Sequence, residues 1–249
     1  MTTGGSDIPR IPRAQDQLFE SPGGARAKYS ALVVGRPGLG ALIKHELCVM
    51  LSQHIPGAFG LAMRKWLYPK LLGSCGRNVI FGQNVVLRHP HKIHVGDNVM
   101  IDDNCLIDAK GTSNTGIRIG SGVFLGRNTI LSCKNGNITL ADGVNIGFNC
   151  EVFSASDVSV GKHTLLAAYC YLIGGDHDMS DPEVPVIEQG RTSAGVRVGD
   201  GAWLGAGAKI LDGVTVGDRA VIGAGAVVRG AVPAGAIAAG VPAKLIGQR

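Results

Sequence analysis

The sequence has six cysteines, but no two stand at Cys-x-x-Cys spacing and none has a histidine partner at the distances of a zinc site. This pattern predicts neither a metal site nor a disulfide framework. Residues 1–30 are polar and rich in Pro and Gly, so no signal peptide is expected. The sequence therefore predicts a cytoplasmic protein whose thiols stay reduced.

Long apolar runs are absent, and aromatic residues make up only 5% of the chain. Arg36, Lys44, His45 and Glu46 interrupt every window that approaches the ~20 apolar residues of a membrane-spanning helix. Hydrophobic residues still amount to 45%, which is not the composition of a disordered chain. We therefore expect a folded protein that does not span a membrane.

The chain also lacks a basic stripe along most of its length. Residues 1–72 hold nine Lys and Arg against four Asp and Glu, whereas residues 73–249 hold fifteen of each. The net charge of +5 thus comes from the N-terminal segment. A solenoid that binds nucleic acid should carry positive charge along its own coils, so no nucleic-acid partner is expected.

Glycine is abundant, with 38 residues, and the chain repeats every six residues. From Val95 onward an aliphatic residue recurs at this period, and a small residue lies four places after it. The pattern is typical of a parallel β-helix, in which three short strands and three turns make one coil. Gly, Asn and Asp at the turns suit corners that need positive φ angles.

The departures from this period all fall at one corner of the predicted coils. The aliphatic positions form triplets, and the intervals between triplets are 12, 9, 8 and finally 26 residues, from Leu172 to Val198. Loops on one edge of a solenoid usually form its functional surface. The longest insertion begins Ile173-Gly-Gly-Asp-His177, so we expect the chemistry there.

The cysteines at small inward positions are expected to be buried hydrophobic residues; these are Cys105, Cys150 and Cys170.

Three regions are predicted along the chain: a flexible tail at 1–28, a helical segment at 29–72 and the β-helix at 73–249. The segment should contain helices at 30–55 and 57–72, and the coils should begin through irregular turns around Phe81 and Leu87. The helices could cap the open end of the solenoid, or lie on an anionic membrane through basic residues and Trp66. The two roles are compatible, so peripheral membrane contact through residues 30–72 stays open.

Residues 196–247 resemble the hexapeptide-repeat acyltransferase superfamily in detail, and residues 95–247 resemble it in pattern. The matching stretches are Val198-Gly-Asp-Gly-Ala-Trp-Leu-Gly-Ala-Gly-Ala-Lys, Ala220-Val-Ile-Gly-Ala-Gly-Ala-Val-Val-Arg and Ala239-Gly-Val-Pro-Ala-Lys-Leu-Ile. They are similar to galactoside, maltose and xenobiotic acetyltransferases and to polysaccharide O-acetyltransferases. The resemblance implies a left-handed β-helix, a homotrimer, and acetyl-CoA or another acyl-CoA as co-substrate between subunits, with no tightly bound cofactor.

The resemblance also implies the site residues. His177 matches the family's catalytic histidine, and an imidazole suits a base that removes a hydroxyl proton during acyl transfer. The Ala206 N–H corresponds to the donor that stabilises the oxyanion. The other positions implied to bind the acyl donor are Trp203, Ala224, Arg229 and Lys244.

On the acceptor side the sequence departs from the sugar-acetylating relatives. Ala155 and Gly147 stand where those enzymes have an acidic residue and an Asn. The remaining polar candidates for substrate binding are Asn149, Asp157, Asp178 and Glu188. The sequence therefore leaves the identity of the acceptor open.

Taken together, the residues favour a CoA-dependent O-acyltransferase that modifies a hydroxyl of a sugar, glycan precursor or small natural product. Three alternatives stay open: an N-acyltransferase on an amino sugar, a γ-carbonic-anhydrase-like metalloenzyme, and a non-catalytic trimeric scaffold. The histidines at 89, 91 and 94 form a cluster, but they lack the ligand spacing of the metalloenzyme.

Overall fold

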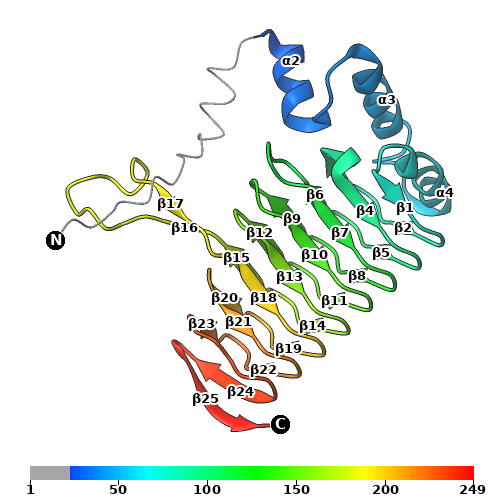
Figure 1. Cartoon of the computed structure of the whole chain (residues 1–249). Helices are drawn as coiled ribbons and strands as arrows, with labels where there is room; N and C mark the ends of the chain where they lie inside the picture. The colour runs from blue at the N-terminus through cyan, green and yellow to red at the C-terminus, as the bar shows by residue number, and fades with distance from the viewer. Residues whose placement is uncertain (1–22) are drawn as a thin grey trace.

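The inward aliphatic residues of the six-residue repeat form the core of the molecule. In the computed structural model, which describes residues 23–249, Ile101, Leu125 and Ile146 lie in one column and are 0% exposed. Successive coils pair in parallel and produce three long faces (Figure 1). The prediction of a parallel β-helix is therefore confirmed.

Each complete coil contributes one short strand to each face. Face 1 consists of β1 (Ser74–Cys75), β4 (Ile93–Val95), β7 (Ile117–Ile119), β10 (Ile138–Leu140), β13 (Val158–Val160), β18 (Val196–Val198) and β21 (Thr215–Val216). Face 2 consists of β2 (Ile80–Phe81), β5 (Met100–Ile101), β8 (Phe124–Leu125), β11 (Asn145–Ile146), β14 (Leu165–Leu166), β19 (Trp203–Leu204), β22 (Val221–Ile222), β24 (Ala236–Gly240) and β25 (Ala243–Gln248). Face 3 consists of β3 (Val86–Arg88), β6 (Leu106–Asp108), β9 (Ile130–Cys133), β12 (Glu151–Ser154), β15 (Tyr171–Gly174), β20 (Lys209–Ile210) and β23 (Val227–Val228).

Side chains of one coil bind the turns of the next. At the corner between faces 2 and 3, Asn128 and Asn149 adopt left-handed φ angles of 60° and 55°. Asn128 Nδ2 donates to Asn149 Oδ1 at 3.0 Å. At the corner between faces 1 and 2, Asp142 Oδ1 accepts from the Ser121 N–H at 2.9 Å. These bonds satisfy turn groups that strand pairing leaves free.

The first coil is more regular than the sequence predicted. Instead of irregular turns, residues 74–88 form a regular first coil of β1, β2 and β3, each paired with the coil that follows. Its inward residues Cys75, Phe81 and Leu87 keep the six-residue spacing. Two of the three are not the branched aliphatic residues of the repeat, which is why the pattern was missed.

The N-terminal helices are also shorter than predicted. Residues 1–22 of the predicted tail lie outside the described part of the chain, and helix α2 (Ala25–Tyr29) begins within the range assigned to that tail. It continues into the π-helical turn η1 (Ser30–Val34), and is followed by α3 (Leu39–Met50), α4 (Gly57–Leu67) and the 3₁₀ turn η2 (Tyr68–Lys70). The continuous helix expected at 30–55 is wrong, because Gly35 adopts φ 69° and Pro37 cannot supply a helical N–H.

This helical segment covers the open strand edge of the first coil. Arg64 of α4 is 1% exposed, and its Nε donates to the Phe81 carbonyl of β2 at 2.9 Å. The Tyr68 hydroxyl donates to the Val85 carbonyl at 2.8 Å, and burial raises the pKa of Tyr68 to about 12. An uncovered strand edge would invite pairing with another chain, so these donors close the solenoid at its start.

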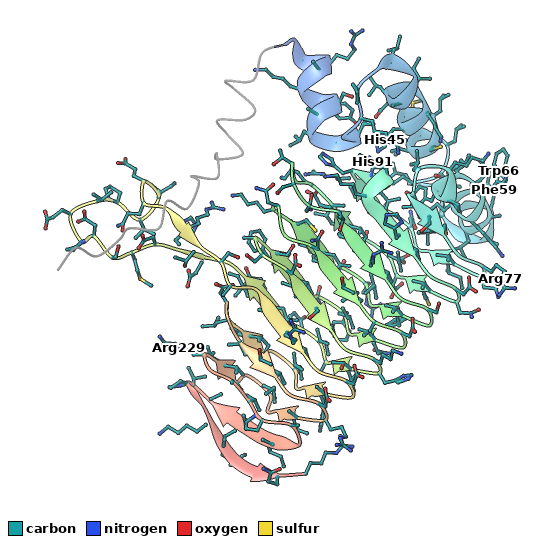
Figure 2. The ribbon with its side chains drawn as sticks, in the orientation of Figure 1. His45, Phe59, Trp66, Arg77, His91 and Arg229 are labelled. Atoms are coloured by element: carbon teal, nitrogen blue, oxygen red, sulfur yellow. The ribbon has the colours of Figure 1, made fainter. Side chains whose placement is uncertain are left out.

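A second contact joins η1 to the 3₁₀ turn η3 (Pro90–Lys92) of the first coil. The His89 N–H donates to the Val33 carbonyl at 2.7 Å, and His89 Nε2 lies 2.9 Å from the Ala31 carbonyl. The ring of His91 lies 6.2 Å from that of His89, and His91 Nδ1 is buried without a hydrogen-bond partner in residues 23–249. Histidines therefore lie where the helices meet the coils, as do the labelled His45 and His91 in Figure 2.

Acid should weaken this junction. Burial, with the nearby cations Arg36 and Lys92, lowers the pKa of His91 from 6.5 to about 4. The unfolded chain then binds a proton that the folded chain does not, so stability present above pH 6.5 is lost as the pH falls toward 4. We expect a loss on the order of 1 to 2 kcal/mol, since the partly exposed ring is screened by water.

Denaturant midpoints measured between pH 4 and 7.5 would test this. His91→Gln should make the midpoint fall less steeply as the pH decreases, because it removes this ionisable group. A wild-type midpoint that is constant across the window would contradict the prediction.

The predicted inward cysteines are confirmed as core residues. Cys105, Cys150 and Cys170 are each no more than 1% exposed. Burial raises the pKa of the Cys105 thiol to about 12, so it stays protonated and unreactive near neutral pH.

Candidate functional site

His177 lies on an arm that leaves the solenoid at the corner between faces 3 and 1. The arm follows β15 and consists of the antiparallel strands β16 (Asp176–His177) and β17 (Arg191–Thr192) with the loop between them. Figure 1 shows it, in yellow, projecting well away from the coils. His177 is exposed and lies opposite Arg191 in the pairing of β16 with β17. The insertion predicted at this corner therefore presents its histidine to the outside.

The base of the arm is fixed to the coils by polar contacts. The two carboxylate oxygens of Asp212 accept from the N–H groups of Ala194 and Gly195, both at 2.8 Å. Ser193 Oγ donates to the Gly174 carbonyl at 3.0 Å, joining the two ends of the arm. The arm thus leaves and re-enters the solenoid at a defined point, which limits the positions that His177 can reach.

The far end of the arm has its own internal structure. Gln189 Nε2 donates to the carbonyls of Asp181 and Val184, both at 2.7 Å. Hydrogen bonding by Ser180 holds the pKa of the Asp178 carboxyl below its usual value. Apolar side chains of this loop are nevertheless exposed, namely Met179, Val186 and Ile187.

The implied oxyanion donor lies at a different corner, between faces 2 and 3. Ala206 follows β19 and is exposed, and its carbonyl accepts from the Gly225 N–H of the next coil at 2.8 Å. Its own N–H has no acceptor anywhere in residues 23–249. Ala224 occupies the equivalent position one coil on, and Trp203 points outward from face 2 with 49% of its surface exposed.

The two basic donor candidates lie apart from this corner and from each other. Arg229 follows β23 and is exposed at the corner between faces 3 and 1; Figure 2 shows it on the side from which the arm projects. Lys244 is exposed on β25, opposite Ala239 of β24. One copy of the chain therefore brings Trp203, Ala206 and Ala224 together, but it holds His177 at another corner.

The acceptor candidates differ in how free their side chains are. Asn149 accepts from Asn128, and Asp157 Oδ1 accepts from the N–H and the Nδ2 of Asn137 at 3.0 and 2.9 Å. Both side chains therefore stabilise the stacking of coils. Glu188 is exposed and its carboxylate has no partner within the described range of the chain.

Two cations near the arm were missed by the sequence analysis. Arg191 lies opposite His177, and Lys134 follows β9 at the same corner. Burial, then the nearby charges of Arg191 and Lys110, lower the pKa of Lys134. Neither Lys134 nor Arg191 has a carboxylate partner among residues 23–249. No motif contains these residues, and only the folding of the arm brings their charges together.

The outward side of face 2 is apolar over much of its length. Ile80, Met100, Leu165 and Trp203 lie in one outward column and are each 38% to 49% exposed, and the half-buried Phe124 and the polar Asn145 lie between Met100 and Leu165. At the adjoining corner the rings of Phe148 and Tyr169 lie 5.8 Å apart and are also exposed. Exposed apolar surface of this extent is typical of a contact surface.

Comparison with known proteins agrees with this architecture. A family model described as bacterial transferase hexapeptide (six repeats) matches residues 195–230. A Mycobacterium tuberculosis protein named as an acetyltransferase is 35% identical over 133 residues, or 53% of this chain, but the match spans only 44% of that relative. WbbJ of Escherichia coli K12, named for O-acetyl transfer in lipopolysaccharide biosynthesis, is 32% identical over 57% of this chain and 74% of WbbJ.

A solved structure shows the same fold. The N-acyltransferase AntD of Bacillus cereus, in complex with dTDP and 3-hydroxybutyryl-CoA, gives a TM-score of 0.53 at 20% identity over 80% of this chain and 90% of AntD. The fold of AntD agrees with the coils of this chain, and the family match and the similarity to WbbJ agree with its six-residue repeat. The chain belongs to the hexapeptide-repeat acyltransferase family, whose fold is the left-handed parallel β-helix.

Proposed function

We propose that this protein transfers an acyl group, in the first instance acetyl, from coenzyme A to a hydroxyl of a sugar or glycan precursor. The observation that carries the proposal is the arm, which presents an exposed histidine at the position that the family sequence implies. The free N–H of Ala206, beside exposed Trp203, supplies the second element that acyl transfer requires.

The active site is proposed to lie between two copies of the chain in a homotrimer. His177 and Ala206 occupy different corners of one copy, so the arm of one copy has to reach the Ala206 corner of its neighbour. Two exposed apolar surfaces support this arrangement: the outward side of face 2 and the arm residues Met179, Val186 and Ile187. Packing the arm against face 2 of a neighbour would bury both.

In the proposed mechanism the imidazole of His177 takes the proton of the acceptor hydroxyl as its oxygen attacks the thioester carbonyl. The negative charge that forms on the carbonyl oxygen is stabilised by the Ala206 N–H. When the carbon–sulfur bond breaks, the coenzyme A thiolate leaves and takes up the proton held by the histidine. No covalent intermediate with the enzyme is needed.

The acyl-CoA would lie along Trp203 and the backbone at Ala224, with Arg229 and Lys244 near its phosphates. The acceptor would lie near the arm, where Asp178 and Glu188 are available and Lys134 and Arg191 favour a substrate with a negatively charged group. Asn149 and Asp157 are proposed not to contact the acceptor directly; their hydrogen bonds hold neighbouring coils together.

WbbJ is named for O-acetyl transfer, which favours a hydroxyl as the acceptor. An amino sugar is the second candidate, because the similarly folded AntD is an N-acyltransferase.

Acetyl-CoA calorimetry, followed by a screen of hydroxyl and amino acceptors, would test the proposal. We expect binding of acetyl-CoA and release of free thiol with at least one sugar hydroxyl, and light scattering should give the mass of three chains. Binding without any turnover would favour the non-catalytic scaffold. No binding, with zinc or iron found by metal analysis, would favour the carbonic-anhydrase-like enzyme.

A further inference from the structure

Helix α3 exposes a stripe of large apolar side chains to solvent. Leu39, Ile43, Leu47 and Met50 follow one another at helical spacing of four, four and three residues, and each is 48% to 73% exposed. The opposite side of the helix carries the buried residues His45 and Cys48. The stripe therefore faces away from the contacts that hold the helix in place.

Helix α4 continues the same kind of surface. Phe59 and Trp66 are 67% and 63% exposed and lie seven residues, or two helical turns, apart. Figure 2 shows both at the outer edge of the helix, directed away from the coils. Lys70 Nζ lies 3.4 Å from the centroid of the Trp66 ring, so a cation accompanies the largest of these side chains. Apolar surface of this size is costly to leave in water.

The charge of the segment indicates what would cover it. Residues 23–72 hold seven Lys and Arg and a single acid, Glu46. Arg64 is buried, whereas Lys44, Lys65 and Lys70 of the helices and the turn after them are exposed. A second copy of the segment would bring like charges together. An anionic bilayer, by contrast, accepts apolar side chains at its interface and attracts Lys and Arg at its headgroups, with Trp at the boundary.

We infer that helices α3 and α4 bind the surface of an anionic membrane. The apolar stripe of α3, with Phe59 and Trp66, enters the interface, and Lys44, Lys65 and Lys70 contact the headgroups. Contact is peripheral: within residues 23–249 no helix is long and apolar enough to cross a bilayer. The inference does not depend on the acyl-transfer activity, because the helices lie at the end of the solenoid and contain none of the proposed site residues.

Vesicle co-sedimentation of the full chain tests the inference. We expect binding to vesicles of equal phosphatidylglycerol and phosphatidylcholine, weak binding to phosphatidylcholine alone, and loss of binding in high salt. The double variant Phe59→Ala/Trp66→Ala should bind at least about tenfold more weakly. Val241→Ala/Ile246→Ala, which removes equally exposed apolar side chains at the other end of the molecule, should bind as the wild type does.

Two outcomes would overturn the inference. One is absence of binding of the wild type to the anionic vesicles; if the double variant then also changes oligomeric mass, the surface serves contacts between copies. The other is vesicle binding that the Phe59 and Trp66 substitutions leave unchanged. Acyl transfer to a soluble acceptor is measured in parallel, so a failure of the proposed function is seen separately.

Discussion

His177→Ala should reduce acyl transfer by about 100- to 10,000-fold while acetyl-CoA still binds, because general-base catalysis by a positioned side chain contributes an effect of this size. The side chain is exposed on the arm. The hydrogen bond from His177 to Asp176 Oδ1, at 2.8 Å, is donated by the backbone N–H and does not involve the imidazole. Removing the imidazole therefore leaves the fold intact. The measurement is the rate of thiol release at saturating acetyl-CoA, beside calorimetry on the same sample.

A matched control comes from a second exposed histidine. His163 lies in a turn at the corner between faces 1 and 2 with φ 55°, a conformation that Asn tolerates, so His163→Asn should keep full activity. Equal losses in both variants would mean that His177 is not the base. Loss of acetyl-CoA binding in His177→Ala would place the residue in donor binding instead.

Mixing two inactive variants tests whether the site is shared. Ala224→Arg should block the donor corner, and His177→Ala removes the base from the arm. If the arm of one copy serves the corner of another, trimers assembled from both variants contain some interfaces with an intact arm and an intact corner, and activity returns. If both groups act within one copy, the mixture stays inactive.

The repeat made most of the fold predictable, because the six-residue spacing alone shows which aliphatic residues point into the core. Val95 and Ile101 illustrate this, since both lie inward on adjacent faces as expected. Prediction failed where the spacing was kept by other residues. Cys75 and Phe81 fill the same inward positions in the first coil, but their residue types gave no repeat signal.

The site was predictable only as a set of positions along the chain. The family resemblance points to His177, Ala206 and Trp203, but sequence spacing does not tell at which corner each one projects. The structure places His177 at one corner and Ala206 and Trp203 at another, and the proposal of a site shared between two copies rests on this separation. Lys134 and Arg191 could not be found from sequence, because they come together only when the arm folds back.

Arg64, in the helical segment, also has a position that the sequence alone did not predict. Beside Lys65 and Trp66, it fits a basic surface helix, yet it is 1% exposed. Its three hydrogen bonds go to the carbonyls of Phe81, Ser52 and Ile55 at 2.8 to 2.9 Å, and burial lowers its pKa. Only long-range contact with β2 distinguishes it from its exposed neighbours.

Arg64→Ala should therefore detach the helical segment from the first coil. The substitution leaves three carbonyl groups without donors, two of them buried and that of Ile55 half-buried, for an expected loss of about 2 to 4 kcal/mol in the stability of this junction. Because each coil contacts only its neighbours, the coils further along should stay folded while the edge of β2 becomes exposed. Hydrogen exchange should increase across α4 and the first coil, and the protein should aggregate at lower concentration than the wild type.

Lys65→Ala is the control, since this neighbouring side chain is exposed and its loss should change stability by less than about 0.5 kcal/mol. Arg64→Lys should recover only part of the loss, because one ammonium group cannot reproduce the two donor nitrogens that Arg64 directs at separate carbonyls. If Arg64→Ala exchanged hydrogen at the wild-type rate in α4 and β2, the covering of the strand edge would have to come from Tyr68 and His89, and Arg64 would have no part in closing the solenoid.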